Sequence, residues 1–320
     1  MSAVDSPAPV RPAAAHRGRT AAVVAGLTAA LVVLAVLSAC LGQVPTSPAE
    51  VIGSVLHRLG LDLGPLPAHP AGEVTLWEVR FPRVVLAVVV GASLGCAGAL
   101  LQGVFANPLA EPGVIGVSAG AAVGACAAIV LGGAFTAGWA LAGAAFVTGL
   151  LTTTLVYVLS RSEGRTEVVT VILTGVAVNA FAGGLIALFT FVASPAARDQ
   201  IVFWQLGSLG GATWEVVSVV APLAVGGVVA AVVLAPKLDL LALGEHVARH
   251  LGVDVERVRQ AAIVVVAVVL RAGAALYMGD TVTDLPGIHD QITYDALARS
   301  IVAGRGFSFP RAWYPFTPAN

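Results

Sequence analysis

Lysine is almost absent from this sequence of 320 residues. It occurs once, at Lys237, directly after Pro236. A phosphate-binding loop needs Gly-Lys-Ser/Thr, in which the lysine reaches the β- and γ-phosphate oxygens. The chain contains no such loop and therefore does not hydrolyse ATP by that route.

Charged residues are also scarce: they make up 11% of the chain, whereas soluble domains carry about 25%. Apolar residues make up 58%, and the mean hydropathy is +0.91. The 17 basic and 18 acidic residues nearly cancel, so the totals give no sign of a nucleic-acid-binding surface. This composition rules out a disordered chain, argues against a soluble enzyme, and favours an all-α, polytopic transmembrane helical bundle.

Cysteine occurs three times, at Cys40, Cys96 and Cys126, each alone in an apolar run. The spacing excludes a CxxC redox or metal site, and buried small hydrophobic side chains are the simplest interpretation. We expect no metal site.

The apolar runs between charged residues predict about seven membrane spans, since a crossing helix needs about 20 residues. The first six are expected at residues 20–41, 84–105, 114–131, 135–159, 168–193 and 216–235. The first run has no A-x-A cleavage site, so we interpret it as an uncleaved helix and not as a secretory signal. A seventh run follows Arg259 but meets Arg271 after 11 residues, which makes it the weakest span.

Spans three and four share one charge-free run of 49 residues, 112–160. As a single helix it would be about 74 Å long, more than twice the thickness of a bilayer. The run must therefore fold back, and Gly132, Gly133 and Gly138 mark the expected break.

The basic residues favour a cytoplasmic N-terminus, because positive charge concentrates on the inside. In that orientation nine basic residues lie inside: Arg11, Arg17, Arg19, Arg161, Arg165, Lys237, Arg249, Arg257 and Arg259. Four lie outside before the seventh span: Arg58, Arg80, Arg83 and Arg198. Residues 1–19, rich in proline and alanine, are expected to form a disordered cytoplasmic tail.

Glycines stand four apart inside two expected spans, at Gly91 and Gly95 and at Gly120 and Gly124. This spacing lets helix backbones approach closely. Helix packing is the simpler interpretation, and a glycine-lined transport path is the alternative.

Three segments contain residues that a generic membrane-spanning helix does not explain. The first begins at the entry to span two and continues through the join with span three, and its distinctive residues are Arg80, Pro82, Arg83, Gln102, Asn107, Pro108 and Pro112. It predicts a tight polar hairpin, although turn chemistry alone would also explain it. The second, 203–214, has a tryptophan near each end and predicts an interfacial segment.

The third segment, 238–260, has a broken helical stripe of apolar residues and contains His246 and His250. That i, i+4 spacing suits zinc, but a zinc protease needs Glu directly after the first His, where Val247 stands. With no third ligand evident, a short amphipathic helix held against a soluble partner fits better.

Several motifs resemble the permease subunits of ABC importers for ferric siderophores, haem and cobalamin. They are Arg80-Phe-Pro-Arg, Gly-Ala-Leu-Leu-Gln-Gly-Val-Phe, Asn-Pro-Leu-Ala-Glu-Pro-Gly, Gly-Val-Ser-Ala-Gly-Ala, Leu-Thr-Gly-Val-Ala-Val-Asn, Phe-Trp-Gln-Leu-Gly-Ser-Leu and Leu-Gly-Glu-His-Val-Ala-Arg-His-Leu-Gly. The resemblance covers about 51–269. It implies a permease of about ten spans, with no chemical catalysis and no bound cofactor, that works with a second permease subunit, a cytoplasmic ATPase and an extracytoplasmic binding protein.

The resemblance also assigns roles to individual residues. The loop that docks on the ATPase would include Leu243, Gly244, Glu245, Ala248, Leu251 and Gly252. The cytoplasmic gate would fall near Arg165, Thr166 and Thr170. The binding protein would dock near His57 and Arg58, where complementary charge gives register and association rate.

After about Val269 the family pattern stops, which divides the chain into a permease region, 20–269, and a divergent extracytoplasmic tail, 270–320. The tail resembles the first outside loop of membrane glycosyltransferases that use lipid-linked sugars, with Asp290 nearest to their catalytic acid, although a solvated Asp is the simpler interpretation. We hypothesise a fusion or misassembly near Arg271, and we expect such a shortened permease to import poorly.

The leading functional hypothesis is an ABC importer permease in the cell membrane for a ferric siderophore or related metal chelate. A glycosyltransferase remnant is the alternative. A secondary transporter is a third possibility, but ion coupling usually needs intramembrane ionisable groups, and these are scarce between spans one and six. The substrate and the choice between homodimer and heterodimer stay open.

Overall fold

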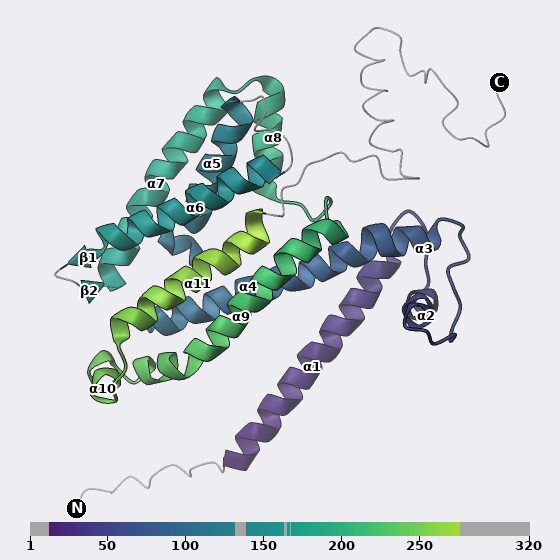
Figure 1. The fold of residues 1–320 in the computed structure, drawn as a ribbon, viewed down its shortest axis with the longest axis horizontal. Coiled ribbons are helices and arrows are strands. Elements are labelled where there is room, and N and C mark those ends of the chain that lie inside the picture. The colour runs from purple at the N-terminus through teal and green to yellow at the C-terminus, as the bar shows by residue number, and fades with distance from the viewer. Residues whose placement is uncertain (1–12, 132–138, 163–164, 167, 276–320) are drawn as a thin grey trace, which may run out of the picture. The chain divides into compact units, whose positions relative to one another are not determined.

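The computed structural model describes residues 13–131, 139–162, 165–166 and 168–275. Within them the elements are helices except for one hairpin of two short strands, each two residues long (Figure 1). The elements are α1 Ala13–Cys40, α2 Pro48–Arg58, α3 Gly72–Val74, π-helical η1 Thr75–Arg80, α4 Phe81–Phe105, 3₁₀-helical η2 Pro112–Ile115, α5 Val117–Leu131, α6 Trp139–Leu159, β1 Arg161–Ser162, β2 Arg165–Thr166, α7 Val168–Val192, α8 Pro195–Leu206, α9 Trp214–Ala242, α10 Glu245–His250 and α11 Val255–Ala275. The all-α prediction is confirmed.

Within the described residues, five helical stretches are long and apolar enough to cross a membrane. They are Gly18–Cys40, Gly72–Phe105, Ala140–Leu159, Val168–Val192 and Trp214–Ala242. Helices α5 and α11 occupy the positions of the expected third and seventh spans, so the chain is a polytopic membrane protein with five to seven crossing helices. The expected break at Gly132, Gly133 and Gly138, the tail beyond residue 275 and Asp290 lie outside the described residues.

Three helix boundaries differ from the prediction. Helix α1 begins at Ala13, inside the expected disordered tail, because an alanine run has high helix propensity and extends the span. The third span is split by Gly116, whose φ of +76° ends η2 and leaves α5 only 15 residues long. Helix α9 continues through Pro236 to Ala242, because Leu238 and Leu241 are buried in the core and their packing outweighs the proline's missing hydrogen bond.

The chain forms two compact units, one containing residues up to Val88 with Ala212–Val217, the other containing Val89–Gly211 and the segment from Ser218. In the first unit, the nearly buried Arg80 side chain caps the carboxyl end of α1. Its guanidinium donates to the carbonyl oxygens of Ala39 (2.7 Å) and Val44 and to the hydroxyl of Thr46 (3.1 Å). A cation at a helix carboxyl end satisfies orphan carbonyls and opposes the helix dipole, so Arg80 holds α1 against η1.

A capping box starts α2 in the same unit. Ser47 Oγ accepts from the Glu50 backbone N–H, and Glu50 Oε2 accepts from the Ser47 N–H at 2.7 Å. The other carboxylate oxygen of Glu50 accepts from the Ala68 N–H at 2.9 Å, so it fastens the segment after α2 back onto that helix.

The second unit is organised around α5, which packs against α6, α7 and α8 (Figure 1). A Cβ atom at Gly120 would lie 2.1 Å from Thr152 Oγ1, and one at Gly124 would lie 2.8 Å from the Ala144 carbonyl oxygen. Gly120 and Gly124 therefore allow α5 and α6 to pack closely. The pair Gly91 and Gly95 differs, because a Cβ atom there meets nothing within 4 Å in the described part of the chain.

Helix α8 is absent from the sequence prediction, which expected only an interfacial segment nearby. Ser194 caps it by accepting from the Ala197 N–H, Pro195 opens it, and Gly207 follows it with a φ of +71°. The fully buried Ile201 fixes α8 in a core cluster with α5 and α6. Trp214, at the other end of the expected segment, begins α9 and donates from Nε1 to the Trp77 carbonyl oxygen at 2.6 Å.

We predict that Gly124→Ala lowers the unfolding temperature of the detergent-solubilised protein, measured by circular dichroism, because overpacking at a tight contact costs about 1–3 kcal/mol. Gly95→Ala is the matched control. It makes the same change in a helix with open space around the new methyl group, and it gains up to about 1 kcal/mol of helix propensity. Equal unfolding temperatures for the two variants would contradict the assigned packing.

We also predict that acid weakens the hydrogen bond that holds the segment around Ala68 to Glu50 of α2. The backbone N–H groups of Ser47 and Ala68 lower the pKa of Glu50 below its ordinary value of 4.5. Because folding lowers the pKa of Glu50, its ionised carboxylate stabilises the folded state at pH values above 4.5. This stabilisation is lost as the pH falls from 4.5 through the lowered pKa and the carboxylate becomes protonated. The protection factor of the Ala68 amide in hydrogen exchange should therefore drop in that range. In Glu50→Gln this pH dependence should vanish, and its persistence would refute the assignment.

Candidate functional site

The segment from Leu243 to Gly252 forms a short helix with a defined stop at each end. Gly244, with a φ of +110°, ends α9 and is the N-cap of α10. At the other end the Val253 N–H donates to the Ala248 carbonyl and the Gly252 N–H to the Arg249 carbonyl, both at 3.0 Å, with Gly252 at a φ of +83°. These paired bonds are a Schellman motif, and both glycines supply backbone conformations that other residues rarely adopt.

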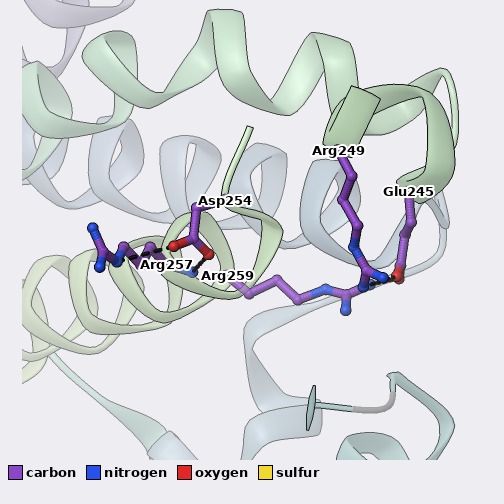
Figure 2. A network of polar contacts seen from close by, with 5 residues as sticks. All are labelled: Glu245, Arg249, Asp254, Arg257 and Arg259. Carbon is purple, nitrogen blue, oxygen red and sulfur yellow. Dashed lines mark hydrogen bonds and ion pairs between the residues drawn. The ribbon is translucent and has the colours of Figure 1, made fainter. Parts of the chain in front are cut away.

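An ion-pair cluster fixes α10 to the start of α11, as Figure 2 shows. Glu245 Oε2 pairs with Arg249 Nη2 at 3.1 Å within α10, and Glu245 Oε1 pairs with Arg259 of α11. The Arg259 side chain is only 7% exposed. Asp254 caps α11 by accepting from the Arg257 N–H, and its carboxylate pairs with the Arg257 side chain at 2.9 Å.

This placement of α10 buries its one alanine and leaves the larger apolar side chains in and beside the helix exposed. Ala248 is fully buried against α11, in a cluster that includes Val255 and Val258. Leu243, Val247 and Leu251 are 66%, 45% and 60% exposed. We call these three residues the α10 edge. An exposed apolar edge rimmed by charged residues is typical of an interaction surface.

The two histidines of α10 lie one helical turn apart, near the helix backbone. His250 Nδ1 lies 2.7 Å from the His246 carbonyl oxygen, so this ring nitrogen is engaged by the helix backbone. Among the described residues, no three His, Cys, Asp or Glu side chains are grouped to hold a metal ion.

The expected gate residues lie around the β1–β2 hairpin, where Arg161 faces Thr166 and Ser162 faces Arg165. Ser160, at the end of α6, donates to the carbonyl oxygens of Val156 and Thr170, at 2.6 and 3.4 Å. The hairpin is therefore fastened at its base to both α6 and α7.

His57 and Arg58, the residues predicted to meet the binding protein, lie together in the last turn of α2. Each already has a local contact. His57 Nδ1 is 3.3 Å from Asp62 Oδ1 and its Nε2 is 3.1 Å from the Gly64 carbonyl oxygen, while the Arg58 guanidinium lies 4.9 Å from the centre of the Trp77 ring.

The polar segment after α4 forms the expected tight turn. Asn107 Oδ1 accepts from the Leu109 N–H at 2.9 Å, and the Asn107 N–H donates to the Gln102 carbonyl oxygen. Pro112 opens η2, whose Gly113 carbonyl accepts from Asn179 of α7 at 2.9 Å. Pro82 is buried in α4, while the Arg83, Gln102 and Pro108 side chains are exposed.

The sequence prediction missed one polar cluster, at the junction of α6 and α11. The Tyr157 hydroxyl donates to Glu256 Oε1 at 2.7 Å and accepts from Gln260 Nε2 at 2.6 Å. About 100 residues separate Tyr157 from its partners, and nothing in the local sequence pattern pairs them.

The model of the FecCD transport family matches residues 30–281. The match starts before residue 51 and runs past 269, so it exceeds at both ends the stretch expected from the motifs. A cobalamin import system permease, BtuC, from Halobacterium salinarum is 38% identical over 65% of this chain and 57% of its own length. A hemin transport system permease, HmuU, from Yersinia pestis is 34% identical over 63% of this chain and 61% of its own.

A solved structure described as an inward-facing conformation of a metal-chelate type ABC transporter aligns with a TM-score of 0.66 and 27% identity. The alignment covers 79% of this chain and 75% of that one. The chain thus spans about three fifths of the length of the two curated relatives above. Because the family model covers most of the chain and agrees with its helical membrane fold, the protein belongs to the FecCD transport family, whose members are transport permeases and not enzymes.

Proposed function

We propose that this chain is a permease subunit of an ABC importer, carrying a metal chelate or a similar large ligand across the cell membrane. The observation that carries the proposal is the α10 edge: three exposed apolar side chains, one in α10 and one just beyond each of its ends, on a helix that an ion pair joins to α11. Such an edge suits a soluble partner, and the family relationship makes that partner an ATPase.

In this proposal the energy comes from a separate ATPase chain, which fits the lack of a phosphate-binding loop around the single Lys237. The chain then needs no cofactor of its own, because its partner binds ATP. In the proposed orientation the N-terminus and α10 are cytoplasmic. A second permease subunit would complete the path, and an extracytoplasmic binding protein would deliver the ligand near His57 and Arg58.

The substrate class follows from the relatives, whose names specify cobalamin and hemin import, and from a structure described as metal-chelate type. Within this class we propose a ferric siderophore as the cargo. The glycosyltransferase alternative gains no support here, because Asp290 lies outside the described residues.

We predict that Val247→Asp abolishes co-purification of the ATPase subunit with a tagged chain. A carboxylate in the middle of the α10 edge has to be desolvated in the interface, at a cost of several kcal/mol. Val247 is 45% exposed, so the substitution leaves the fold of α10 intact.

Leu63→Asp is the matched control, because it introduces the same charge at an exposed leucine in the loop after α2. This variant should retain the ATPase. If Val247→Asp captures as much ATPase as Leu63→Asp does, the α10 edge is not the docking surface.

A further inference from the structure

The first two turns of α11 contact two different elements through adjacent residues. Arg259 reaches α10 by pairing with Glu245 (Figure 2), and Gln260 reaches α6 by donating to the Tyr157 hydroxyl. Glu256, one turn earlier, accepts from the same hydroxyl. The start of α11 is therefore a bridge with α10 on one side and α6 on the other.

Apolar packing makes this bridge stiff. The buried Val156 of α6 lies in one cluster with Val255, Val258 and Ala262 of α11, and Tyr157 packs against that cluster. The cluster also contains Ala248 of α10. Close-packed interiors transmit displacement with little compression, so a shift of α10 has to move α11 and, through it, the end of α6.

Tyr157, the residue of α6 that the bridge contacts, also contacts the β1–β2 hairpin. The Arg161 guanidinium, at the first residue of β1, lies 5.7 Å from the centre of the Tyr157 ring, within the range of a cation–π contact. Figure 1 shows the hairpin and the first turn of α11 at the same end of this unit. Tyr157 thus contacts α11 with its hydroxyl and the hairpin with its ring.

We propose that Tyr157 is a positioning residue that transmits movement of α10 to the β1–β2 hairpin, making the start of α11 the mechanical link between ATPase docking and the gate. The proposal rests on the proposed function and adds the route of coupling to it. A tyrosine suits this role because its hydroxyl donates and accepts at once, so it joins a carboxylate and an amide from successive turns of one helix.

Tyr157→Phe tests the proposal, since it deletes the hydroxyl and keeps the ring. The complete transporter is purified with its ATPase, the native cysteines replaced, and a fluorescent label placed at Val169→Cys, an exposed position in the first turn of α7 beside the hairpin. The change in label fluorescence on adding ATP and vanadate is the readout. Thr154→Val is the matched control, because it removes a hydroxyl of α6 that bonds only within its own helix, to the Leu150 carbonyl.

We expect Tyr157→Phe to retain ATPase capture and ATP hydrolysis but to reduce the label response about tenfold, the scale of one lost hydrogen bond to a charged group. Gln260→Leu should give a similar loss, and the double variant should lose no more than either single one. Thr154→Val should respond like the parent.

A parental response in Tyr157→Phe would overturn the proposal and leave the proposed function standing. Loss of ATPase capture in Tyr157→Phe would also overturn it, because the hydroxyl would then hold the structure and not transmit movement. If the parent complex itself captures no ATPase, the proposed function fails and this proposal fails with it.

Discussion

The pairing of Arg259 with Glu245 is the interaction on which the site depends. A guanidinium as buried as that of Arg259 needs a charged or hydrogen-bonding partner, and the first residue of α10 supplies it. Glu245 itself is 42% exposed, so water screens part of the attraction, and the pair sets the orientation of α10 more than it adds stability. With Glu245 held inward, Ala248 is buried and the α10 edge faces out.

This arrangement explains how a chain without its own nucleotide site belongs to a family of ATP-driven importers. In the proposed function, the membrane helices are the scaffold, and the six-residue helix α10, between Gly244 and Gly252, offers a surface to the ATPase. The start of α11 contacts α10 through Arg259 and α6 through the Tyr157 hydroxyl, and the Tyr157 ring in turn contacts Arg161 of the hairpin. The elements to which we assign docking, transmission and gating all belong to the second compact unit of the chain.

Local sequence patterns predicted most of the long helices and the segment that contains α10. The charge brackets located the apolar helices, and the broken apolar stripe of 238–260 predicted a short helix where α10 forms. Two further local signals mark the starts of helices outside the predicted spans: Ser47 with Glu50 is a capping box at α2, and Ser194 with Pro195 marks the start of α8.

Other features had no local signal. The capping of α1 by Arg80 and the hydrogen bonds of Tyr157 join residues 34 to 103 positions apart, and a single sequence does not pair such positions. The continuation of α9 past Pro236 depends on tertiary burial of Leu238 and Leu241, which overrides the local penalty of a proline. Close helix packing at Gly124 but not at Gly95 likewise depends on which helix lies opposite.

The membrane side on which α10 lies tests the central claim most directly. In a variant with the native cysteines replaced, a membrane-impermeant thiol reagent is applied to intact cells carrying either His250→Cys on α10 or Leu63→Cys in the loop after α2. The account predicts that Leu63→Cys reacts in intact cells and that His250→Cys reacts only after permeabilisation. Rapid labelling of His250→Cys in intact cells would place α10 outside, beyond the reach of any ATPase, and would contradict the account.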